Sequence, residues 1–397
     1  MVDRGMSRAS RGYLVLEDGS YFSGTLFGGL RSYRALSRSV TLETLGEVVF
    51  NTAMCGYEEV LSDPSYHGQI VVMTTSHVGN YGITLQDQES SKVHVAGMAV
   101  MELAETPSNW RARKSLDEYL RQHKVAGLFG IDTRAVTKHL RSTGTRRWAI
   151  VAVGGRTGFH PGRTIEKIRR HPVMEGLALA QDVSVAKPRL WRRGRLAAWP
   201  NLGERRPRIA VLDFGIKWSI LRNLSSMGFA PVVVPWRSRA GEILAINPKG
   251  IVLSNGPGDP AALIDVIGEI RSILKSKRRA PILGICLGHQ LLGLASGGRT
   301  YKMKFGHHGV NHPVQDTASR RVWISSHNHG FAVDPDTLAS DVRVTFTSLN
   351  DGAVEGIESE ERRFFSVQFH PESAPGPWEA RGIFQRFREM ALPYAPS

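Results

Sequence analysis

The sequence contains very little cysteine. Cys55 and Cys286 are the only two cysteines among its 397 residues. Two cysteines exclude a disulfide framework and an all-cysteine metal site. Long apolar runs are also missing, since none approaches the roughly 18 residues that cross a bilayer. The apolar stretch at residues 13–16 is too short for a signal peptide. We therefore expect a soluble cytoplasmic protein that does not associate with membranes.

Nucleotide-binding motifs are missing as well. The dipeptide Gly-Lys never occurs, so the chain has no Walker loop. The stretch 256–261, GPGDPA, matches a degenerate dinucleotide fingerprint, but the acid expected about twenty residues later is replaced by the basic run 276–279. Asp213-Phe214-Gly215 copies a kinase triplet without the accompanying H-R-D loop. The glycines of the first motif are better suited to pointing backbone N–H groups at a developing oxyanion.

The sequence has fewer acidic than basic residues, 36 against 51, and its formal net charge is +15. The basic residues are scattered except in one dense run within 186–208, which also contains three prolines. This composition is typical of an exposed linker, so we expect domains at 1–185 and 208–397 joined by a basic linker at 186–207. We expect no nucleic-acid binding; a salt-sensitive DNA shift would show the opposite.

The most informative stretch is 281–293, PILGICLGHQLLG. A short apolar run, a G-x-C-x-G turn and the start of a helix follow one another, as in the elbow that presents a nucleophile. A side chain on either flanking glycine would collide with the incoming helix. The helix N-terminus would favour a reactive thiolate at Cys286. The alternative for Cys286 is a small cysteine that fills a gap in the core. We expect Cys55 to be structural.

The pattern around this stretch predicts the fold class. Beyond residue 208, strands at 209–212, 232–234 and 251–253 alternate with amphipathic helices, which indicates a parallel sheet covered on both faces. Reactive groups gather at the carboxyl ends of such strands. The N-terminal half has a mixed α/β pattern, with expected strands and helices at 13–16, 48–51, 57–61, 70–74, 116–123 and 133–141.

A base for the thiol follows the expected strand 364–368. His370 and Glu372 are separated there by Pro371, so cysteine, histidine and carboxylate form a triad in outline. A surface turn is the alternative for these residues alone. Five further histidines lie in glycine-rich segments that we interpret as loops without a register. We therefore expect no metal site at these residues, which are His307, His308, His312, His327 and His329.

Together these motifs resemble a known family over nearly the whole chain. SNGPGDP, GICLGHQLL and FHPE resemble class I glutamine amidotransferases. LVLEDGSYFSG, GEVVFNTAMCGYEEVLSDPSY, IDTR and KMKFGHHGVNHPV resemble the small, glutamine-hydrolysing subunit of carbamoyl-phosphate synthase. The sequence departs from that family in its basic N-terminal extension, a longer segment 28–44, the arginine-rich linker, and His327 in place of an expected glutamine.

The resemblance implies a role for each matching residue. Cys286 would be the nucleophile, His370 the proton shuttle and Glu372 its orienting partner. Leu287 and Gly258 would supply the backbone oxyanion donors. The positions that match the family's glutamine contacts are Ser65, Gly256, Gly258, Leu287, Gln290, Asn328, Gly330 and Phe331.

The resemblance also implies a partner. We expect a heterodimer, or an oligomer of heterodimers, with a large subunit that binds ATP and Mg or K ions and consumes bicarbonate. This chain itself would bind L-glutamine and hold no cofactor, in arginine or pyrimidine biosynthesis. Two alternatives remain: a cysteine hydrolase that cleaves esters or lactones without a partner, and a silent regulatory scaffold.

Overall fold

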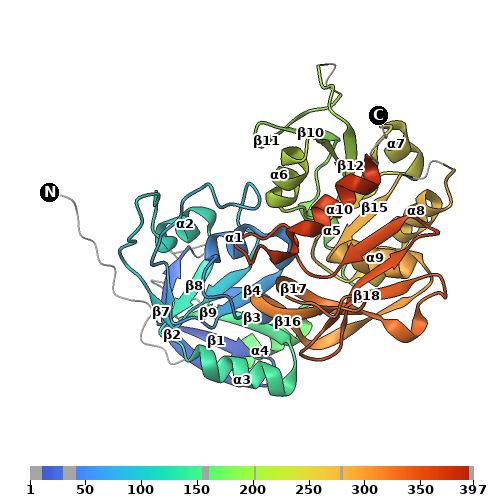
Figure 1. Ribbon diagram of the computed structural model, residues 1–397. Helices are drawn as coiled ribbons and strands as arrows, with labels where there is room; N and C mark the ends of the chain where they lie inside the picture. The colour runs from blue at the N-terminus through green and yellow to red at the C-terminus, as the bar shows by residue number, and fades with distance from the viewer. Residues whose placement is uncertain (1–10, 30–41, 154–160, 201–202, 278–279, 393–397) are drawn as a thin grey trace. The chain divides into compact units, whose positions relative to one another are not determined.

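The computed structural model describes residues 11–29, 42–153, 161–200, 203–277 and 280–392 (Figure 1). The N-terminal extension, residues 30–41 of the longer segment, and Arg278 and Arg279 of the basic run lie outside these ranges. The chain divides into two compact units, Met1–Val173 and Met174–Ser397. Among the described helices, none is both long and apolar enough to cross a membrane.

The strands of the first unit form a closed sheet in the order β1-β2-β8-β6-β4-β3-β9. Their bounds are β1 Arg11–Leu16, β2 Tyr21–Gly28, β3 Leu42–Asn51, β4 Gln69–Met73, β6 Gly97–Ala99, β8 Ala126–Phe129 and β9 Arg146–Ala152. A separate small sheet pairs β5 His77–Val78 with β7 Glu102–Leu103. Trp148 and Leu14 are fully buried inside this unit.

Among the described residues, three helices of the first unit begin where the sequence predicts, and the fourth, α4, was not predicted. They are α1 Tyr57–Ser62, α2 Leu116–His123, α3 Thr133–Thr143 and α4 Pro161–Arg170. The side chain of Asp132 accepts a hydrogen bond from the Ala135 N–H, as expected of an N-cap. Ser115 and Glu118 form a capping box at the start of α2. Local chemistry therefore sets these helix starts.

The second unit is built on an 11-stranded sheet, in the order β11-β10-β13-β12-β14-β15-β20-β19-β18-β16-β17. Its centre is parallel, from β13 through β12, β14 and β15 to β20. The bounds are β10 Arg189–Arg192, β11 Arg195–Ala198, β12 Arg208–Asp213, β13 Ala230–Pro235, β14 Gly250–Leu253, β15 Ile282–Ile285, β16 Arg299–Asp316, β17 Val322–Asp334, β18 Arg343–Ser348, β19 Val354–Ser359 and β20 Phe364–Val367.

Helices cover both faces of the parallel centre, which confirms the predicted α/β class. On β12, Ala210 and Leu212 pack with α7 Ala240–Ala245, α8 Ile264–Leu274 and α9 Leu287–Ala295. Ile209 and Val211 point to the other face, with α6 Trp218–Ser226 and α10 Gly382–Ala391. Burial on both faces explains why these strands are continuous apolar runs.

The expected linker is folded over part of its length. β10 and β11 form a hairpin, and β10 continues the sheet beside β13. Leu190 and Trp191 are buried in the apolar clusters on opposite faces of the sheet. The prediction of an exposed linker is therefore wrong for Leu190 and Trp191. The two units divide after Val173, whereas the sequence analysis placed the end of the first domain at residue 185. β10 was not recognised in the sequence because only two of its side chains are buried and its other residues are charged.

Candidate functional site

The Cys286 elbow has the predicted form. β15 ends at Ile285, α9 begins at Leu287, and Cys286 between them has φ 55° and ψ −107°. Such a conformation costs a non-glycine residue about 1–3 kcal/mol and persists only where the surroundings enforce it. A Cβ at Gly284 would lie 2.7 Å from the Gly288 oxygen, and one at Gly288 would lie 2.1 Å from the Leu253 oxygen. Both glycines are therefore required by close backbone approach.

His370 and Glu372 meet in the arrangement that the triad needs. His370 Nδ1 lies 2.6 Å from Glu372 Oε1, and both residues are buried. Its other ring nitrogen, Nε2, makes no hydrogen bond within the described part of the chain. Cys286 and His370 follow the paired strands β15 and β20, and the Cys286 N–H donates to the Val367 carbonyl at 2.9 Å. The thiol itself contacts the Asn328 carbonyl at 3.5 Å.

The pKa values of the pair move in opposite directions. Burial lowers the pKa of His370, but the Glu372 carboxylate and the Cys286 sulfur outweigh burial and raise the pKa to about 10. Burial raises the pKa of Glu372, but the Lys217 ammonium and His370 outweigh it and lower the pKa to about 2. An anionic Glu372 thus holds the His370 Nδ1–H and leaves Nε2 for the sulfur.

Lys217 is a member of this site that the sequence did not reveal. Its Nζ lies 2.9 Å from Glu372 Oε1, and its side chain is only 4% exposed. The turn before it is fixed by Asp213, whose carboxylate accepts the N–H groups of Gly215 and Ile216. The kinase-like triplet therefore builds a turn that delivers Lys217. Its position just after β12, at the same sheet edge as the elbow, was the available signal.

The predicted oxyanion donors have backbone N–H groups without a partner. Neither the Leu287 N–H at the start of α9 nor the Gly258 N–H donates a hydrogen bond to a described residue. A Cβ at Gly256 would lie 2.1 Å from the Phe214 oxygen, and one at Gly258 would lie 2.5 Å from the Leu177 oxygen. The two glycines thus allow the 254–260 loop to pack against the backbone at Phe214 and Leu177. The loop also contacts the elbow, because the Gly288 N–H donates to the Ser254 carbonyl.

The structure places four of the predicted glutamine contacts of the second unit near one another: Gln290 on α9, and Asn328, Gly330 and Phe331 on β17. Gln290 Nε2 donates to the Phe331 carbonyl at 2.8 Å, which joins α9 to β17. Asn328 Oδ1 lies 3.0 Å from His308 Nδ1. The Lys302 ammonium lies 4.8 Å from the centre of the Phe331 ring, beside Gly330. His308 and Lys302 are therefore further neighbours of this site that the sequence did not indicate.

Ser65 lies in the first unit, on the short turn Pro64–Tyr66, and is buried. Its N–H donates to Asp63 Oδ1 at 2.8 Å. Asp63 is the cap of this turn. The contribution of Ser65 to glutamine binding stays a prediction.

The interpretation of the histidine-rich segments as loops is wrong. All five histidines lie on β16 or β17, and His307 pairs with His329 and His308 with Asn328 in the ladder. The register shifts between Lys302 and His307 and again between Gly309 and His312. Such bulges interrupt the alternation of side chains, so no period of two is visible in the sequence.

The comparisons with known proteins cover both units. Residues 14–150 match the carbamoyl-phosphate synthase small chain, CPSase domain, and residues 210–390 match glutamine amidotransferase class-I. The carbamoyl phosphate synthase small chain of Nitratidesulfovibrio vulgaris (strain Hildenborough) is 48% identical over 96% of this chain and 98% of its own length.

Two further relatives agree. The small chain of Solidesulfovibrio magneticus is 46% identical over 95% of this chain and 97% of its own length. The small chain of Aquifex aeolicus is 46% identical over 95% and 98% of the two chains. This chain belongs to the carbamoyl phosphate synthase small-chain family. The resemblance inferred from the motifs is therefore confirmed, and this small chain carries its elbow, His370 and Glu372 within the amidotransferase match.

Proposed function

We propose that this chain hydrolyses L-glutamine with a Cys286, His370 and Glu372 triad and supplies the ammonia to a large synthase subunit. The observation that carries the proposal is the strained elbow beside a buried imidazole, whose Nδ1 is held by Glu372 and whose Nε2 is unpaired among the described residues. This is the arrangement of an activated nucleophile, its base and the group that orients the base.

The reaction follows from these positions. The Cys286 sulfur attacks the side-chain carbonyl carbon of glutamine, and the thiol proton passes to His370 Nε2. His370 then protonates the amide nitrogen, the C–N bond breaks, and ammonia leaves while the glutamyl group stays on Cys286 as a thioester. Water attacks the thioester while His370 removes its proton, and glutamate leaves as the thiol is restored. The N–H groups of Leu287 and Gly258 stabilise the oxyanion in both steps.

The partner follows from the product. Ammonia at neutral pH is mostly protonated and therefore not nucleophilic, so it must reach its acceptor without mixing with the solvent. The family relationship supports a large subunit that combines ammonia with bicarbonate and ATP. ATP and its metal ions would then bind to the large subunit.

The test replaces the nucleophile in the complete complex. Cys286→Ser should stop glutamate release, because a serine hydroxyl is far less readily deprotonated than a thiol. The same complex should still make carbamoyl phosphate from added ammonia, which serves as the control for folding and assembly. Normal glutamine turnover by the variant would reject the triad.

An ester or lactone hydrolase is the competing activity. It would require turnover of such substrates by the chain alone and no response to glutamine. The same assay, run with a p-nitrophenyl ester and without a large subunit, separates the two activities.

A further inference from the structure

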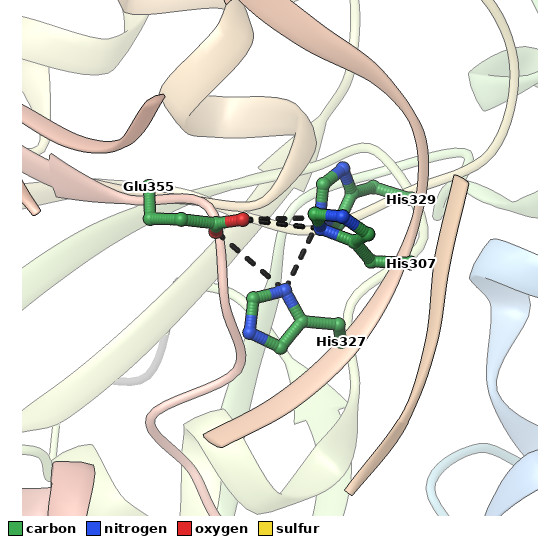
Figure 2. A group of neighbouring side chains, drawn as sticks. All are labelled: His307, His327, His329 and Glu355. Carbon is green, nitrogen blue, oxygen red and sulfur yellow. Dashed lines mark hydrogen bonds and ion pairs between the residues drawn. The ribbon is translucent and has the colours of Figure 1, made fainter. Parts of the chain in front are cut away.

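Four buried ligand groups converge behind the strand that carries the predicted glutamine contacts. His307 on β16, His327 and His329 on β17 and Glu355 on β19 place one nitrogen or oxygen each within 4.8 Å of one another. Figure 2 shows the Glu355 carboxylate directed at the three rings. The four side chains are at most 4% exposed. None of them belongs to the triad.

The distances within this histidine–glutamate cluster suit one small ion. His307 Nδ1 lies 3.2 Å from Glu355 Oε1, and His327 Nδ1 lies 3.5 Å from Glu355 Oε2. His327 Nδ1 also lies 3.2 Å from His329 Nε2, which is 3.9 Å from Glu355 Oε1. Neighbouring ligands of a tetrahedral zinc, with bonds of about 2.0–2.2 Å, lie about 3.3–3.6 Å apart.

An outer partner orients each ring. His307 Nε2 lies 2.9 Å from Asp351 Oδ2, and His329 Nδ1 lies 2.9 Å from the Phe331 carbonyl. Both partners accept, so these outer nitrogens carry the protons and the inner nitrogens of neutral rings are bare. Ligating histidines have this arrangement, with the other N–H donated to a carboxylate or a backbone carbonyl.

The outer ring nitrogen of His327 contacts a hydroxyl group. Its Nε2 lies 2.7 Å from Ser325 Oγ, which also donates to the His312 carbonyl at 3.1 Å. When the hydroxyl proton goes to this carbonyl, Oγ accepts from His327 Nε2–H. His327 Nδ1 is then bare and faces the bare Nε2 of His329. Two lone pairs at 3.2 Å repel each other unless a cation lies between them.

We propose that His307, His327, His329 and Glu355 bind one zinc ion in a closed, structural site. Three imidazoles and one carboxylate are donors that zinc accepts in tetrahedral geometry. Glu355 and the adjacent Asp351 balance the two positive charges, as a buried ion requires. Asp351 is 43% exposed and connects the cluster to the solvent. The ion would tie β17 to β16 and β19.

A proton shared within the cluster is the alternative. In that case the Ser325 hydroxyl donates to His327 Nε2, His327 Nδ1–H donates to His329 Nε2, and one further proton lies between His307 and Glu355. The 3.9 Å contact between His329 Nε2 and Glu355 Oε1 is then left without a proton. Glu355 Oε2 also remains without a hydrogen bond within the described residues. A metal ion accounts for all four contacts. The inference does not depend on the proposed glutaminase reaction.

The test measures metal in the full chain. Protein stripped with a strong chelator and then titrated with ZnSO₄ should bind one equivalent, measured by mass spectrometry after gel filtration. Co²⁺ in its place should give the intense visible bands of tetrahedral cobalt. Zinc should also raise the Tm of the stripped wild type, a readout that needs no substitution.

Matched variants locate the site. His327→Gln and Glu355→Gln keep similar volumes but remove a ligand, and each should weaken zinc binding by about 100-fold or more. His139→Gln, which removes a histidine on α3 of the first unit, should still bind one equivalent. Failure of stripped wild type to bind zinc or to shift its Tm would overturn the proposal. So would an octahedral cobalt spectrum, or equal zinc binding by all the variants.

Discussion

Lys217 links the proposed catalytic residues His370 and Glu372 to the sheet. It lies at the N-cap of α6 and contributes the charge that keeps Glu372 ionised in a fully buried position. Asn255 holds its backbone, because Asn255 Oδ1 accepts the Lys217 N–H at 3.1 Å. The 254–260 loop, recognised in the sequence for its glycines, thus also positions this lysine. The site is a line of Cys286, His370, Glu372 and Lys217.

Removing the lysine charge should impair catalysis and stability together. Lys217→Met leaves Glu372 buried beside His370 alone, which should cost about 3–5 kcal/mol of unfolding free energy. Glutamate release should fall in kcat more than KM changes, because orientation of His370 is lost. Lys249→Met, which removes an exposed lysine of the same unit, should alter neither. Stability unchanged by Lys217→Met would contradict this account.

The pH dependence of stability gives an independent check. The folded-state pKa of Glu372 is lowered to about 2 from 4.5, so its contribution is present above pH 4.5 and is lost as pH falls towards 2. This contribution is about 3 kcal/mol. Urea unfolding should therefore show a smaller loss between pH 5 and pH 3 for Glu372→Gln than for the wild type. An equal loss of unfolding free energy in both proteins would mean that Lys217 and His370 do not lower the pKa of Glu372.

At the scale of elements, the predictable features are those encoded locally. The elbow was predictable because Gly284 and Gly288 mark close backbone contacts within one strand-turn-helix segment. Lys217 was not predictable as a triad neighbour, because its partner Glu372 is far away in the sequence. The long β16–β17 hairpin was missed because bulges break its alternation. Charge and proline concealed β10, where only Leu190 and Trp191 point inward.

In the β10–β11 hairpin, the contribution of packing can be tested separately from the contribution of charge. Trp191 is 2% exposed, and its ring centre lies 5.8 Å from that of Trp218 in α6. Trp191→Ala should therefore cost about 3–5 kcal/mol of unfolding free energy. Replacing Arg192 and Arg195 by Gln should change stability and glutamate release very little, because both arginines are exposed. Loss of partner affinity in the arginine variant would instead identify an interface.

The hairpin turn makes a stabilising prediction as well. Arg193 and Gly194 both have positive φ, 52° and 74°, between the paired residues Arg192 and Arg195. A two-residue turn of this kind favours asparagine at its first position. Arg193→Asn should raise the unfolding free energy by up to about 1 kcal/mol. A lower Tm would show that the arginine side chain contributes contacts that outweigh backbone strain.

At the scale of the whole molecule, each unit matches a different part of the family. The first unit contains the small-chain match and Ser65, and the second contains the amidotransferase match and the proposed triad. The cysteine of the first unit, Cys55, is exposed, and partial burial and the Glu59 carboxylate raise the pKa of its thiol, which disfavours a reactive thiolate. We therefore expect its contribution to be docking of the large subunit, with Ser65 as its link to glutamine.

Glutamine hydrolysis should accordingly depend on the partner. The chain alone should release glutamate slowly, and the complex with ATP and bicarbonate should release it much faster. A 100-fold stimulation corresponds to about 2.7 kcal/mol, within the usual range of coupling between two sites. Glutamate release is measured for the chain, the complex, and the complex with both ligands. Ser65→Ala should raise KM for glutamine in the last case, while Ser226→Ala, an exposed serine at the end of α6, should not. Equal rates in all three states would reject coupling and favour a glutaminase that works without a partner.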